Sequence, residues 1–134
     1  APYPPAYPWG NKFDPNYANV GETGIGNTSS VGAFPQGRSS YGLLDMSGNV
    51  WEWTRSLWCK EVSEPEFRYP YIPSDGRENL KADVNIARVL RGGSFYSNHG
   101  VARCAYRYWG SPGSWVDYYG FRVGVVSPIS ISGL

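Results

Sequence analysis

Few residues in this chain are of the types that carry out catalysis. There is one histidine, His99, and there are two cysteines, Cys59 and Cys104, in 134 residues. A two-histidine iron site needs a second imidazole, and a lone histidine gives no argument for a Ser-His-Asp arrangement. The cysteines form either one disulfide or two buried thiols, and the sequence leaves both open. The residue chemistry therefore favours binding over catalysis.

The segment with a distinctive composition is residues 95–119, which hold five Tyr, two Trp, one Phe, three Ser and three Gly. Tyr and Trp give a large contact area at low rotamer entropy, while Ser, Gly and Asn give adaptable hydrogen bonding. This mixture is typical of antibody binding loops. The sequence therefore predicts a recognition surface between two framing segments, residues 88–94 and residues 120–126.

Length and charge set the class of protein. A chain of this size forms one domain with a core of its own. Its net charge is +1 with no basic run, so nothing indicates nucleic acid. No apolar run reaches the roughly 20 residues of a membrane span. Seventeen Gly and eleven Pro favour short strands and long ordered loops.

The framing elements follow from local patterns. Residues 50–54 combine β-branched and aromatic side chains, which predicts a strand with Trp51 and Trp53 packing into the core from one face. Residues 88–94 and 120–126 are predicted to be the strands on either side of the recognition surface. The apolar alternation of residues 120–126 supports this interpretation.

The remaining segments are predicted to be loops. Four prolines among residues 1–10 indicate an extended or polyproline arm. Residues 11–32 are polar and rich in turn signals, with residues 17–20 pinned to the body of the domain. Residues 59–87 are charged and broken by proline, which predicts a long insertion with a turn at residues 74–76.

Six motifs occur in order: YPWG, YANV, YGLLDMSGNVWEW, RVLRGGSF, RCAYR and GFRV. Together they resemble the signatures of the formylglycine-generating-enzyme-like domains, a branch of the C-type lectin fold. The resemblance implies an α+β fold with little helix and a single C-type lectin-like domain over residues 1–134. It begins partway through the family domain, so the earlier elements of that larger domain are absent from this chain.

Two enzymatic classes of the family fit poorly. The copper oxidases carry a pair of cysteines between the GGS segment and the RCAYR segment, and residues 95–102 contain none. The iron enzymes use three histidines in an added helical domain, against one histidine here. A degenerate or partial formylglycine-generating oxidase is the alternative that the family keeps open.

The third class resembles this chain more closely: the variable proteins of diversity-generating retroelements. Their pattern RGGSW, ARxAYR and GFRV is followed here with Phe95 in place of Trp, which implies a variable region over about residues 91–126. Adenine-directed mutation of Asn codons cannot produce Lys, Glu, Gln, Met or Trp. The first four are absent from residues 95–126, whereas residues 1–94 contain eleven of them. Trp109 and Trp115 require another route, such as an AGG arginine codon that becomes TGG by one adenine change. An ordinary fixed aromatic loop remains the competing interpretation.

The resemblance implies a binding function without catalysis, directed at a protein or cell-surface ligand and compatible with display on a cell or a viral particle. Trp51, Trp53 and Phe121 would pack beneath the surface. The predicted ligand-binding residues are Tyr96, Ser97, Asn98, His99, Gly100, Val101, Tyr108, Trp109, Gly110, Ser111, Ser114, Trp115, Val116, Asp117, Tyr118 and Tyr119.

Two further sets of residues have predicted roles. The resemblance implies a candidate calcium site with ligands from Asp45, Gly48, Val50 and Glu52, whose oxygens suit a hard cation. The alternative is that Asp45 caps a turn and Glu52 meets an arginine, and no cofactor is required for binding. Three arginines, Arg103, Arg107 and Arg122, are expected to pair with carboxylates such as those of Asp45 and Glu52 or with loop carbonyls.

Overall fold

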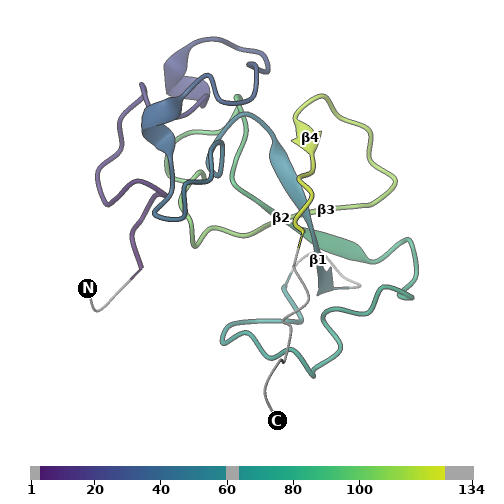
Figure 1. Cartoon of the computed structure of the whole chain (residues 1–134). Coiled ribbons are helices and arrows are strands. Elements are labelled where there is room, and N and C mark those ends of the chain that lie inside the picture. The colour runs from purple at the N-terminus through teal and green to yellow at the C-terminus, as the bar shows by residue number, and fades with distance from the viewer. Residues whose placement is uncertain (1–3, 60–63, 126–134) are drawn as a thin grey trace.

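The computed structural model describes residues 4–59 and 64–125, in which regular elements are short and loops are long (Figure 1). In chain order the elements are the 3-10 turns η1 (Gly21–Thr23) and η2 (Pro35–Gly37) and the strands β1 (Trp51–Cys59), β2 (Ala87–Arg91), β3 (Tyr108–Gly110) and β4 (Tyr119–Gly120). No α-helix occurs within the described ranges, which confirms the prediction of short strands with little helix.

The four strands form one sheet in the order β3-β2-β1-β4. Strand β1 pairs antiparallel with β2 and parallel with β4, and β2 pairs antiparallel with β3. Trp53 lies opposite Leu90, and Leu90 lies opposite Tyr108. Because paired residues point to the same side, one face carries Trp51, Trp53, Leu90 and Tyr108, as predicted for the two tryptophans. We call it the tryptophan face.

The core lies along the two central strands. Trp51, Leu57, Val89 and Leu90 are buried, and Leu90 is fully inaccessible. Strand β1 extends further than the predicted residues 50–54 because pairing with β2 continues to Leu57 and Cys59, with an irregular register between Trp53 and Leu57. Strand β2 runs from Ala87 to Arg91, which confirms the first part of the strand predicted over residues 88–94. Residues 92–94 are not strand, because Gly92 and Gly93 adopt positive φ values of 93° and 76°.

The N-terminal segment is a folded part of the domain. Tyr7 is buried, stacks on Trp9 at 5.2 Å between ring centroids, and closes a turn through Tyr7 N–H donating to Gly10 O at 2.8 Å. The prediction of an extended arm is therefore wrong from Tyr7 onward, because aromatic packing overrides the proline-rich local preference. The buried Ala18 and Val20 confirm that residues 17–20 are pinned.

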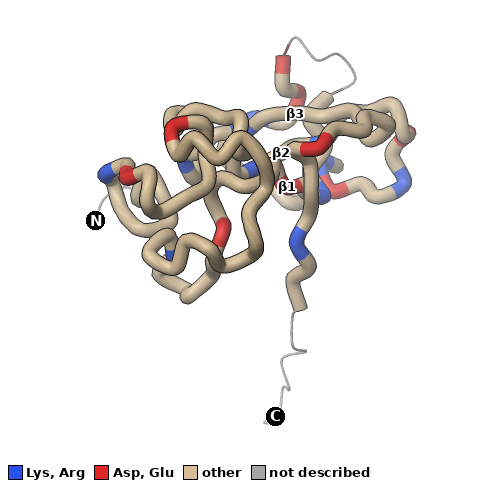
Figure 2. Tube along the Cα trace, turned by 90° about the horizontal axis from the view of Figure 1, so that it is seen from above, with Lys and Arg blue, Asp and Glu red and all other residues tan. Residues whose placement is uncertain are grey.

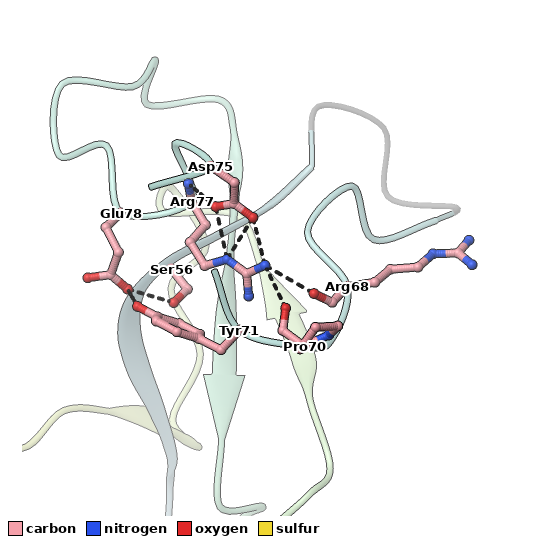
Figure 3. A network of polar contacts seen from close by, with 7 residues as sticks. All are labelled: Ser56, Arg68, Pro70, Tyr71, Asp75, Arg77 and Glu78. Carbon is pink, nitrogen blue, oxygen red and sulfur yellow. Dashed lines mark hydrogen bonds and ion pairs between the residues drawn. The ribbon is translucent and has the colours of Figure 1, made fainter. Parts of the chain in front are cut away.

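Arg77 organises the long segment between β1 and β2, as Figure 3 shows. Its side chain is 4% exposed, and its guanidinium donates to the Asp75 carboxylate at 2.7 Å and to the Arg68 carbonyl at 3.0 Å. Its own carbonyl accepts from Leu57 N–H in β1 at 2.7 Å. The ion pair therefore holds the loop together, the main-chain bond from Leu57 joins it to the sheet, and the predicted insertion is confirmed over its described residues.

Replacement of Arg77 by Ala is expected to lower the melting temperature by about 5 °C or more, because Asp75 and two loop carbonyls lose their donor. Thermal unfolding followed by circular dichroism measures this. Arg68→Ala is the matched control, since Arg68 and its partner Glu64 have side chains 66% and 77% exposed. A shift as large for Arg68→Ala would contradict the assigned role of Arg77.

The chain after β4 differs from its prediction. Residues 121–125 form no strand, and Phe121, Val123 and Val125 are 75%, 79% and 90% exposed. Phe121 therefore does not pack beneath the recognition surface. Its apolar alternation predicted a strand, but β4 pairs with β1 only over Tyr119 and Gly120. Val126 lies outside the described residues.

Charged side chains of both signs are interspersed along the trace (Figure 2). Neither helical turn in residues 4–59 and 64–125 has the length or apolarity to cross a membrane. The structure leaves Cys59 and Cys104 unjoined to each other. Burial raises the pKa of the Cys104 thiol, while the nearby Arg91 acts in the opposite direction.

Candidate functional site

The first predicted binding segment, residues 95–101, is fixed through its main chain. Phe95 N–H donates to Asn49 O at 3.0 Å, and Ser97 O accepts from Gly21 N–H at 2.8 Å. His99 N–H donates to the Glu22 carboxylate at 2.9 Å. The side chains of this segment are not needed for these bonds. Its path is therefore set by residues far away in the sequence.

Ser97 is an exception within this segment. Its side chain accepts from Ser94 N–H at 2.9 Å, its own N–H donates to Ser94 O at 2.8 Å, and it is only 8% exposed. These bonds close a tight buried turn directly after β2. Ser97 lies in the interior as part of the frame, which the sequence analysis did not predict.

The second predicted binding segment runs from β3 through a loop to β4. Tyr118 O accepts from Trp51 N–H at 2.8 Å, which ties the end of the loop to β1. Gly110 is buried beneath it, and a Cβ there would lie 2.8 Å from the Trp53 ring and 3.0 Å from Leu90. Gly110 is therefore a second predicted contact residue that the structure places in the frame.

The aromatic side chains of the two segments lie at the surface. Trp115 is 95% exposed and Tyr96 67%, while Tyr118 is half-buried. Tyr96 and Tyr118 make an edge contact at 5.8 Å, although 22 positions separate them in the chain. We call the set Tyr96, Tyr108, Trp115, Tyr118 and Tyr119 the aromatic patch.

The tryptophan face of the sheet supports the aromatic patch from below. Trp51 contacts Tyr108 at 5.2 Å and Trp53 meets Tyr119 edge-on at 5.4 Å. Burial raises the pKa of the Tyr119 hydroxyl, and the neighbouring Tyr108 and Tyr118 raise it further. Trp51 and Trp53 therefore act as the floor of the patch, as the sequence predicted.

The remaining predicted contact residues differ in their exposure. Five of them are exposed: Asn98, His99, Ser114, Val116 and Asp117. Four more are half-buried: Gly100, Val101, Trp109 and Ser111. Fourteen of the sixteen predicted positions are thus at least partly accessible, and only Ser97 and Gly110 are not.

His99 is held by residues that the sequence analysis missed. Its Nδ1 lies 2.7 Å from Glu22 Oε1, its ring stacks on Phe13 at 4.9 Å, and its carbonyl accepts from the Tyr7 hydroxyl at 3.2 Å. These contacts join segments more than 75 positions apart, so no local sequence signal could reveal them.

Glu22 gives the anchoring of this segment a pH dependence. Burial acts to raise the pKa of its carboxyl, but hydrogen bonds from the main chain and ring of His99 outweigh it. The net pKa lies below the ordinary 4.5. A carboxyl with a lowered folded-state pKa stabilises the fold above its ordinary pKa and loses that contribution as pH falls through the lowered value.

The amide proton of His99 is therefore expected to titrate with a midpoint below 4.5, the ordinary pKa of this carboxyl. An NMR series from neutral pH down to about pH 2.5 would record its chemical shift. Glu22→Gln should abolish the titration. A midpoint at or above the ordinary value would show that the bond to the carboxylate is not formed.

Two of the four predicted calcium ligands, Asp45 and Glu52, are already engaged. Asp45 Oδ2 accepts from Gly32 N–H at 2.7 Å, and Glu52 Oε1 lies 2.6 Å from the guanidinium of Arg122. The same guanidinium donates to the Asp45 carbonyl at 2.8 Å. A cation of the protein thus occupies these oxygens, and they do not fit calcium as they lie. Calcium binding there stays a prediction that requires Arg122 to move away.

The three predicted scaffold arginines behave differently from one another. Arg122 pairs with Glu52, and its pKa is raised by hydrogen bonding to that carboxylate against the opposing effect of burial. Arg103 donates to the Gly100 carbonyl at 2.7 Å. Both fulfil the prediction. Arg107 has no such partner among the described residues and lies instead over the rings of Trp58 and Tyr69.

The chain is a C-type lectin-like domain. It has short strands in one curled sheet, long ordered loops, and two tryptophans beneath a surface formed by two segments. Residues 3–126 match the family described as "Sulfatase-modifying factor enzyme 1-like domain", and the chain belongs to that family.

Its relatives include enzymes and a protein named as inactive. The chain is 36% identical over 132 residues to the formylglycine-generating enzyme of Mus musculus, covering 87% of this chain and 32% of that protein. It is equally identical to "Inactive C-alpha-formylglycine-generating enzyme 2" of Bos taurus, covering 87% and 36%. The chain thus spans about a third of the length of these relatives.

Two solved structures share the fold at 28% identity. One is Treponema denticola variable protein 1, with a TM-score of 0.56 over 79% of this chain and 34% of that one. The other is PvdO from Pseudomonas aeruginosa, with a TM-score of 0.63 over 90% and 42%.

Proposed function

We propose that this domain is the ligand-binding variable protein of a diversity-generating retroelement, and that it binds a protein or cell-surface ligand through the aromatic patch without catalysis. The observation that carries the proposal is that the main chain of residues 95–99 is fixed by hydrogen bonds while an aromatic side chain of the same segment is exposed. The main chain of residues 95–99 is bonded to Asn49, Gly21 and Glu22, while Tyr96 points to solvent. Side chains on such a backbone can be exchanged without altering its path.

The composition of the exposed residues supports binding. Exposed aromatics such as Trp115 and Tyr96 are a solubility liability unless a partner covers them, and Tyr and Trp are enriched among residues that dominate binding energies. The likeness to Treponema denticola variable protein 1 agrees with this proposal.

The DNA flanking the gene provides the test. Sequencing it is expected to reveal a reverse transcriptase gene and a near-copy of codons 91–126 that differs from them only at adenines. The retroelement assignment would be wrong if the near-copy differed equally at all four bases, or if the flanking DNA contained no near-copy.

Family membership favours a second candidate, a degenerate or partial formylglycine-generating oxidase. Oxygen consumption by the copper-loaded protein with a cysteine-containing peptide would separate the two. Turnover would overturn the non-catalytic assignment, and its absence, with the enzyme from Mus musculus as positive control, would remove the second candidate.

A further inference from the structure

A pocket of about 180 Å³ lies on the side of the sheet opposite the tryptophan face. Val89 and Arg91 line it, and their side chains alternate with that of Leu90, which belongs to the tryptophan face. The pocket is therefore separate from the aromatic patch. Arg77 and Arg107 complete a set of three guanidinium groups around it, and we call it the arginine pocket.

Only one of these three charges is neutralised. Arg77 is paired with Asp75 at 2.7 Å. Arg91 donates to the carbonyl of Cys104 and, at 3.4 Å, to the hydroxyl of Tyr69, both uncharged. Arg107 lies over the Tyr69 ring at 5.4 Å. Within residues 4–59 and 64–125, neither Arg91 nor Arg107 forms an ion pair with a carboxylate.

The nearby carboxylates are committed elsewhere. Glu52, opposite Arg91 across the strand pair, is held by Arg122 at 2.6 Å. Glu78 accepts from Ser56 at 3.0 Å and from the hydroxyl of Tyr71. Counted over residues 4–59 and 64–125, the pocket therefore carries an excess of two positive charges.

Arg107 shows the electrostatic consequence. Burial lowers the pKa of its guanidinium and Tyr69 acts to raise it, while the charges of Arg77 and Arg91 lower it further. A partly buried cation without a counter-ion costs free energy, which a bound anion removes.

We propose that the arginine pocket binds a phosphate group. A phosphate monoester carries about 1.5 to 2 negative charges at neutral pH, which matches the excess of Arg91 and Arg107. Guanidinium forks bind pairs of phosphate oxygens. The hydroxyl of Tyr69 accepts from Arg91 and keeps its own hydrogen for a further oxygen.

Calorimetric titration of the full chain with inorganic phosphate, at constant ionic strength and about pH 7.5, tests this site. Arg107→Gln is expected to weaken phosphate binding at least about tenfold, and Arg107→Lys by less, because it keeps the charge but loses the fork. Arg38→Gln is the matched control, since Arg38 is exposed and lies outside the pocket. If Arg107→Gln fails to fold, Arg107→Lys carries the comparison.

Three results would overturn the proposal. They are equal phosphate affinity of the wild type and Arg107→Gln, an equal loss of affinity in Arg38→Gln, and no heat of binding up to about 20 mM phosphate. Acetate binding as tightly as phosphate would overturn the choice of a dianion. Titration with O-phosphoserine separates two sources of the same group, and tighter binding than inorganic phosphate supports a monoester on a larger molecule. None of these results depends on the aromatic patch.

Discussion

Replacement of Gly48 by Ala is expected to destabilise the domain by more than about 3 kcal/mol. Gly48 has a φ of 81°, and a Cβ there would lie 2.4 Å from the main-chain oxygen of Asn19. Its N–H donates to Gly92 O at 2.8 Å, and the next residue, Asn49, donates to Asn19 O at 2.7 Å. The clash would therefore separate the N-terminal segment from the segment after β2. Urea unfolding measures the loss.

Two other glycines separate the cost of backbone strain from the cost of the steric clash. Gly24 also has a positive φ, 76°, but no atom lies within 4 Å of its virtual Cβ. Gly24→Ala should therefore cost only the backbone strain of about 1 kcal/mol. Gly113 has neither constraint. Gly113→Ala should change the stability by less than about 0.5 kcal/mol. Equal losses for Gly48→Ala and Gly24→Ala would show that the contact with Asn19 is not tight.

Exchange of four exposed residues at once is expected to leave the melting temperature within about 3 °C of the wild type. The variant combines Tyr96→Asn, Ser114→Tyr, Trp115→Arg and Asp117→Ser, all of which face solvent. The hydrogen bonds that fix this surface come from main-chain atoms, which these changes leave in place. Scanning calorimetry measures the outcome.

A single substitution at a buried position of the same region is expected to destabilise the domain more than the fourfold surface variant does. Ser97→Tyr removes the hydroxyl that accepts from Ser94 N–H and forces a ring into a site that is 8% exposed. It should lower the melting temperature by about 10 °C or more. A greater loss in the fourfold variant than in Ser97→Tyr would contradict the separation of frame from exchangeable surface.

Local patterns were sufficient for the central strands. Strand β1 combines aromatic and β-branched residues, and β2 is a run that the sheet buries on both sides, so neither depends on a distant partner for recognition. The motifs also placed the predicted contact residues between β2 and the end of β4, and the structure leaves most of them at least partly accessible. Residue types and their spacing predict an element correctly where the pattern lies within one continuous segment.

Long-range contacts account for what the sequence did not reveal. Gly110 belongs to the frame because Trp53 and Leu90 surround it in space. Ser97 belongs to it through a local turn with Ser94 and a long-range bond from Gly21 N–H to its carbonyl. Phe121 has the alternation of a strand residue yet is exposed, because pairing ends at Gly120. Alternation tells which residues share a face but not whether a neighbour exists to cover it.

The position of β4 constrains how this surface can change. Strands β3 and β4 lie at opposite edges of a four-stranded sheet. The connecting residues 111–118 must therefore cross three strand spacings, or about 14 Å. Eight residues reach at most about 28 Å when fully extended. Part of that reach is used by the turn that Ser114 N–H closes on Ser111 O. Deletion of a few residues would leave the loop too short to connect β3 to β4. The diversification proposed above would therefore have to hold the number of codons constant, as template copying with base changes does.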